Sequence, residues 1–132
     1  MSSQTRRAFI ALILSQAAHS IEEYVFRLYD VFTPARVVSG LVSADLAFGF
    51  AVANAAVVAF GLWCYVARVR TNRPSGPAWA WFWAVVELAN ASVHATLALV
   101  RGGYFPGVAT APVLAGVSAY LAVKLSQTRR AS

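Results

Sequence analysis

The sequence predicts an all-α membrane protein, a four-helix transmembrane bundle with both ends of the chain in the cytoplasm. Of 132 residues, 59% are hydrophobic and only 12% are charged, whereas about 25% charged residues are typical of soluble domains. Four long segments, three of them apolar almost throughout, alternate with short polar ones, and the positive charges gather where these segments end. The length fits one domain, residues 1–132.

The first expected span, residues 7–32, contains an unusual polar stretch. Its purely apolar part, residues 8–14, is shorter than the roughly 20 residues that a helix needs to cross a bilayer. The span must therefore include the stretch from His19 to Glu23. Thr33-Pro34 should end this helix, because the residue before a proline is pushed out of helical geometry.

Pro and Gly mark the limits of the later spans. Residues 71–77 are the clearest loop. Arg101-Gly102 predicts a helix end with a glycine cap, and Pro106 suits the first position of a helix. The remaining expected spans are residues 41–69, 77–100 and 106–125.

The cations predict the orientation. Eight of the eleven Lys and Arg residues lie on the side of the membrane that holds both termini and the loop at residues 71–77. Positive charge favours the cytoplasmic side, so we expect a multi-pass protein of the inner membrane with both termini inside. This topology accounts for the net charge of +6, so no nucleic-acid partner is expected. The expected surroundings are the lipid bilayer, and the oligomeric state stays undetermined.

Polar side chains from different spans should meet in one layer. His19 lies about 18 Å along the first span and Glu87 about 15 Å along the third. On each of these helices the polar residues share one face, and charge facing lipid is costly, so both faces should point inward. Two groups form the layer: His19, Glu22 and Glu23, and Glu87, Asn90 and His94. Additional candidates at similar depth or on the same face are Gln16, Asp45 and Thr110.

Three short motifs occur in order along most of the chain. They are His19-x-x-Glu22-Glu23, Asn90-x-x-x-His94 and Pro106-Gly107-x-x-Thr110. In these motifs the sequence resembles the HXXEE-domain family of small prokaryotic membrane proteins. The resemblance implies a shared site but names no reaction. Glu87 and Asp45 lie outside the motifs and are candidates on geometry alone.

The residue types suit a metal-dependent enzyme. Two histidines and one glutamate with an open position are typical of hydrolytic zinc sites, and we predict His19, His94 and Glu23 as ligands. Glu22 or Glu87 would be the general base or a further ligand, and Asn90 would orient a group or bind substrate. Counting Asp45, the four carboxylates also suit a two-iron oxidative site, so zinc and iron both remain open. A lipid-like or apolar small molecule would enter from the bilayer.

Two other functions use the same residues. Crowded carboxylates repel one another, so one stays protonated and a metal-free acid/base isomerase or cyclase becomes chemically feasible. The layer could also serve non-catalytic ligand binding, transport or helix association. Pro106 to Thr110 are either a simple helix start or a positive helix end that faces the carboxylates. Asp45 has a second interpretation as a helix cap. Asn54 lies deeper and on the opposite side of its helix from Asp45, so we do not expect it in the site.

Overall fold

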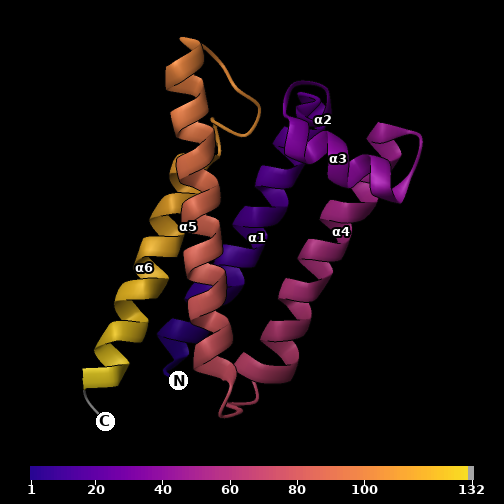
Figure 1. Cartoon of the computed structure of the whole chain (residues 1–132). Coiled ribbons are helices and arrows are strands. Elements are labelled where there is room, and N and C mark those ends of the chain that lie inside the picture. Colours follow the sequence, from indigo (N-terminus) through magenta and orange to yellow (C-terminus); the bar gives the residue numbers. More distant parts are fainter. Residues whose placement is uncertain (131–132) are drawn as a thin grey trace.

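Helix α1 (Ser3–Val25) runs through the middle of the molecule, between α4 on one side and the pair formed by α5 and α6 on the other (Figure 1). The computed structural model describes residues 1–130, and side chains up to residue 127. Within these residues the fold is all-α, as predicted, with six α-helices and one π-helical turn. The side chains of Arg129 and Arg130, which belong to the predicted cytoplasmic cations, lie outside the described residues.

Four of the helices are long. Besides α1 they are α4 (Leu46–Cys64), which continues into the π-helical turn η1 (Tyr65–Val69), α5 (Gly76–Arg101) and α6 (Ala111–Arg130). Helix α5 packs along α6, and α1 packs against α6 and α4, whereas α4 and α5 have few contacts. The helices Leu46–Val69 and Gly76–Arg101 are long and apolar enough to cross a membrane.

The first helix is shorter than expected, which corrects its predicted end at Phe32. Helix α1 ends at Val25, and Arg27 adopts a left-handed backbone with φ 56°. Two unpredicted helices follow, α2 (Leu28–Val31) and α3 (Thr33–Val42). Pro34 does not simply stop a helix. It lies in the first turn of α3, where its missing N–H group would have had no helical partner.

The start of the next long helix also differs from the prediction. Helix α4 begins at Leu46 rather than Leu41, because Ser43 is extended and Asp45 caps the new helix. One carboxylate oxygen of Asp45 accepts hydrogen bonds from the N–H groups of Ala47 at 3.0 Å and Phe48 at 3.1 Å. Asp45 is therefore a helix cap, the second interpretation of this residue.

The last helix begins at Ala111, not at Pro106, and it continues to Arg130 rather than ending at Leu125. Residues 106–110 form consecutive turns instead. Gly107 lies there with φ 95°, a conformation that side chains with a Cβ rarely adopt. The glycine cap of α5 is confirmed, since Gly102 is left-handed with φ 67°.

Two apolar clusters and a set of polar residues make up the interior. The larger cluster joins α1, α5 and α6 and includes Phe9, Leu12 and Leu114. The smaller one includes Leu28 and Phe105. The buried polar set contains most of the predicted layer: Gln16, His19, Glu22, Glu23, Glu87 and His94.

Candidate metal centre

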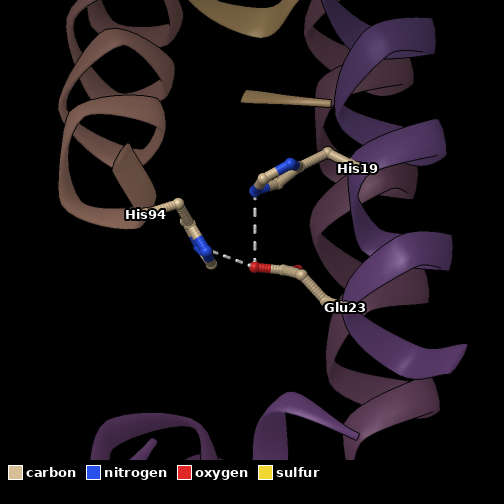
Figure 2. Close-up of side chains that lie close together, drawn as sticks. All are labelled: His19, Glu23 and His94. Atoms are coloured by element: carbon tan, nitrogen blue, oxygen red, sulfur yellow. Dashed lines mark ion pairs between the residues drawn. The ribbon is translucent and has the colours of Figure 1, made fainter. Parts of the chain in front are cut away.

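Two histidines and one glutamate meet inside the protein. Helix α1 supplies His19 and Glu23, which are one helical turn apart and share a face, and α5 supplies His94. Glu23 Oε1 lies 3.0 Å from His94 Nε2 and 3.4 Å from His19 Nε2 (Figure 2). All three side chains are buried, with residue exposures of 0%, 5% and 2% for His19, Glu23 and His94.

The opposite nitrogen of each imidazole is held by a second group. His94 Nδ1 lies 2.6 Å from the carbonyl oxygen of Pro106, which can only accept, so this nitrogen carries the hydrogen. His19 Nδ1 lies 2.7 Å from Thr110 Oγ1. The Thr110 hydroxyl has acceptors at Glu22 Oε2 and at the carbonyl of Gly107. It donates its single hydrogen to one of these, and therefore accepts from His19.

In the neutral histidines, these bonds leave both Nε2 atoms as bare acceptors turned towards Glu23. His19 Nε2 has no hydrogen-bond partner among the described residues. Three acceptor atoms that face one another without a hydrogen between them repel, unless a cation lies among them. Ligating histidines usually donate their other N–H group to a carbonyl or similar acceptor, as both do here.

The separations also suit a metal ion. Metal–ligand bonds of about 2.0–2.1 Å in a tetrahedral site place ligand atoms about 3.3–3.4 Å apart. The two distances from Glu23 Oε1, 3.0 and 3.4 Å, lie close to this value. One ligand atom from each residue lies within 4.8 Å of the others. The residues present therefore fit a metal ion, and this group could hold one.

Glu22 faces a different part of the molecule from Glu23. Its Oε1 accepts from the Tyr104 hydroxyl at 2.5 Å and from the N–H groups of Gly107 and Ala109 at 3.2 and 3.0 Å. Its Oε2 accepts from the Thr110 N–H at 2.8 Å and from the Thr110 hydroxyl at 2.5 Å. The Glu22 carboxylate thus anchors the α5–α6 connection, and the N–H groups that face it belong to the turns before α6 and not to the helix itself.

Tyr104 is a site residue that the sequence does not predict, because a tyrosine at this position fits equally well as an interfacial aromatic residue. In the structure its hydroxyl donates to Glu22. Burial of this hydroxyl and the neighbouring carboxylate both raise the pKa of Tyr104 above its usual range. Nothing in the local sequence distinguishes Tyr104 from other tyrosines near helix ends, so only the path of the connection reveals this contact.

Gly107 lies between the two imidazole rings. A Cβ atom at this position would lie 2.5 Å from His94 Nδ1 and 2.8 Å from His19 Cε1. The two rings are nearly perpendicular, with centroids 4.7 Å apart. The glycine of the third motif therefore has a specific purpose, since any larger residue would push the histidines from their positions.

A cavity of about 320 Å³ opens beside Glu23 and His94, between α1, α3, α4 and α5. Glu23 and His94 line it together with Glu87, Asn90 and Gln16. Asn90 Nδ2 lies 3.4 Å from Glu87 Oε2. Glu87 and Asn90 thus lie at the cavity wall, near the ion-binding group but outside it.

The contribution of α4 is not the one expected. Asp45 is exposed at the helix cap, and it is not brought to the cavity. Asn54 does line the cavity, and its side chain accepts a hydrogen bond from the Ser20 hydroxyl at 2.7 Å. The angle between Asn54 and Asp45 predicts the wrong side for Asn54, because a capping residue lies outside the helical repeat and is a poor reference for that angle.

The fold and the site define an all-α protein with a buried group of two histidines and one glutamate that could hold a metal ion. The chain belongs to the HXXEE family, described as protein of unknown function with HXXEE motif, whose model matches residues 10–121. The matched segment contains His19, Glu22, Glu23 and the two later motifs. No curated protein and no solved structure matches the chain.

Proposed function

We propose that this protein is a four-span inner-membrane enzyme that uses one divalent metal ion to act on a lipid-like or apolar substrate. The observation that carries the proposal is the convergence of His19 Nε2 and His94 Nε2 on Glu23 Oε1, with each Nδ1 atom already engaged. A buried set of three acceptor atoms with open space beside it suits a metal centre that is accessible to a substrate.

The surface of the helices supports a membrane location. Large apolar side chains point outward along the molecule, and Leu99 and Val100 are 82% and 78% exposed. Exposed apolar area costs roughly 25 cal/mol per Å² in water, a cost that a bilayer would remove. Helices α1 and α6, with 23 and 20 residues, are also long enough to span about 30 Å.

The arrangement of the ends supports the proposed topology. The N-terminus, the α4–α5 connection and the end of α6 lie at one end of the molecule, opposite α2, α3 and the α5–α6 connection (Figure 1). Arg68, Arg70 and Arg73 belong to the first end, whereas Arg27 and Arg36 belong to the second. With more cations at the first end, the positive-inside rule favours cytoplasmic termini.

His19, Glu23 and His94 would hold the metal ion, and zinc and iron both suit these ligands. The bound ion would supply Lewis acidity towards water or a substrate oxygen. Of the four carboxylates considered as ligands, only Glu23 and Glu87 line the cavity, which favours one ion over two. Glu22 is occupied by the α5–α6 connection, so Glu87 is the better candidate for accepting a substrate proton. Asn90 would hold the Glu87 carboxylate in place.

A metal-free acid/base isomerase or cyclase is the second candidate. The distance of 3.0 Å between His94 Nε2 and Glu23 Oε1 favours it, because a shared proton could lie there in place of a metal ion. In that case Glu23 and His94 form the acid/base pair, and Glu87 remains the second carboxylate of the cavity.

Metal content separates the two candidates. The full chain is purified in mild detergent without chelator, and its metal is measured by mass spectrometry and compared with that of His19→Ala and His94→Ala. We expect about one zinc or iron ion per chain in the parent protein and loss of that ion in both variants. A parent protein that is folded and free of metal would overturn the metal-dependent function in favour of the acid/base one.

Turnover tests the enzymatic part. Membrane lipid extract is incubated with the metal-loaded protein and with Glu87→Gln, and the products are compared by mass spectrometry. We expect products only with the parent protein, and unchanged metal content in Glu87→Gln. Equal product formation by both proteins would remove Glu87 from the reaction.

A further inference from the structure

A chain of hydrogen bonds beside the cavity has a defined direction. Asn54 Nδ2 donates to the carbonyl oxygen of Phe50 at 3.1 Å. Because that carbonyl can only accept, the Oδ1 atom of Asn54 must face Ser20, whose hydroxyl donates to it at 2.7 Å. The Ser20 hydroxyl has then used its hydrogen, so it accepts from Gln16 Nε2 at 3.1 Å.

This direction leaves one buried acceptor without a partner. With its amide nitrogen bound to Ser20, Gln16 presents Oε1, which has no hydrogen-bond partner among the described residues. Gln16 is only 4% exposed and lines the 320 Å³ cavity. A buried polar atom in this state is costly unless a ligand or water satisfies it.

The opposite wall of the cavity also presents acceptors. Asn90 uses its Nδ2 group on Glu87 Oε2, which leaves Asn90 Oδ1 and Glu87 Oε1 available. The described residues that line the cavity include no Lys or Arg. The cavity thus combines the carboxylates of Glu23 and Glu87 with two amide oxygens, a set that suits a cationic hydrogen-bond donor and repels an anion.

An apolar groove lies next to the cavity. It has a volume of about 470 Å³ and runs between α1 and α4, where Ala17 and Ile21 face Ala51, Ala55 and Leu62. Phe50 and Asn54 line both the groove and the cavity. These shared residues place the groove beside the cavity at the α1–α4 interface.

We propose that the substrate is a single-chain amphiphile with a protonated primary amine as its head. The ammonium group donates to Gln16 Oε1, Asn90 Oδ1 and the Glu87 carboxylate, and the alkyl chain occupies the α1–α4 groove. An ammonium group has three donors and no acceptor, which suits a cavity whose described lining residues carry two carboxylates and no Lys or Arg. This inference rests on the proposed function, in which Glu87 accepts a substrate proton, and an ammonium group is a proton donor.

Binding of matched probes tests the head group. Dodecylamine, dodecanol and dodecanoate are titrated into the full chain in nanodiscs of zwitterionic lipid, with the signal of empty nanodiscs subtracted. We expect dodecylamine to bind at least about tenfold more tightly than the other two, as for a charge-assisted hydrogen bond. Gln16→Leu and Glu87→Gln should each weaken its binding by about tenfold or more, whereas Gln4→Leu, at an exposed position of α1, should not.

Chain length tests the groove. Ala55→Trp would fill the groove, so it should weaken the binding of dodecylamine and leave the binding of the shorter butylamine unchanged. Ala56→Trp is the matched control, because Ala56 is exposed beside the groove without lining it. Equal effects of the two variants on dodecylamine would remove the groove from the proposal.

The metal content of each preparation separates this inference from the function on which it rests. Protein that holds its metal but binds the three probes equally, or binds dodecylamine unchanged in Gln16→Leu and Glu87→Gln, overturns the amine head alone. Protein that prefers dodecylamine but holds no metal supports the amine head and overturns the metal-dependent function.

Discussion

Glu22 and Glu23 are neighbours in the sequence, but their carboxylates lie in two different environments. Glu22 accepts five hydrogen bonds from the α5–α6 connection and Tyr104. Glu23 faces two imidazoles and an open cavity. Successive residues on a helix point about 100° apart, so one turn of α1 serves two regions of the molecule.

The difference shows that one side of α1 holds the imidazole rings in place, whereas the other side faces the space where a ligand could bind. On the Glu22 side, hydrogen bonds and the close packing of Gly107 hold the imidazole rings in place. On the Glu23 side, α4 has few contacts with α5, and the space between α1, α4 and α5 stays open. A rigid Glu22 side and an open Glu23 side together suit a site that must hold its own side chains in place and admit another molecule.

The largest expected effect comes from replacing each of the two glutamates, separately, with glutamine. Glu23→Gln should lower metal affinity by more than the 10–100-fold that loss of an outer partner usually costs, with little change in thermal stability. Glu22→Gln should chiefly lower stability, by about 1–3 kcal/mol for each N–H or O–H group of the connection left unsatisfied. Metal content and thermal unfolding in detergent measure both. The same metal content and the same unfolding temperature in both variants would show that the Glu22 side and the Glu23 side do not differ in function.

A smaller but still large effect is expected at Gly107. The added methyl group of Gly107→Ala would meet both imidazole rings, and alanine would be strained by about 1–3 kcal/mol at the positive φ. We expect weaker metal binding together with a lower unfolding temperature. Gly103→Ala is the control, because a Cβ there meets nothing within 4 Å. Comparable losses in both variants would mean that the packing of Gly107 against the rings is unimportant.

The smallest expected effect concerns the contact that orients His19. Thr110→Val removes the hydroxyl that joins His19 to Glu22 and should reduce metal affinity by about 10–100-fold, the usual cost of losing an outer hydrogen-bond partner. Thr110→Ser keeps the hydroxyl and should bind metal nearly as the parent protein does. Metal titration with a competing chelator measures the change. Wild-type affinity in Thr110→Val would show that the Thr110 hydroxyl does not affect metal binding.

Much of the site could be predicted because it depends on spacing within single helices. His19 and Glu23 are four residues apart, so any α-helix places them on one face. The same holds for Glu87, Asn90 and His94 on α5. The glycine cap at Gly102 was predictable too, since it requires only a local left-handed conformation.

Other features depend on where the chain turns and on which helices become neighbours. The short helices α2 and α3 follow from a left-handed residue at Arg27, a conformation that arginine does not signal in a sequence. Asn54 reaches the cavity and Asp45 does not, because α4 begins five residues later than its apolar pattern indicated. Tyr104 meets Glu22 only because the α5–α6 connection folds back over α1.

By itself the sequence determined an all-α chain, its apolar helices and the residues that make up the histidine–glutamate group, because composition and helical periodicity are local properties. Only the tertiary structure decided that Glu22 holds the α5–α6 connection instead of serving as a base or a further ligand, and that Gly107 lies between the two rings. Helical periodicity relates directions within one helix, but the rotation of that helix against its neighbours is set by packing between segments distant in the chain.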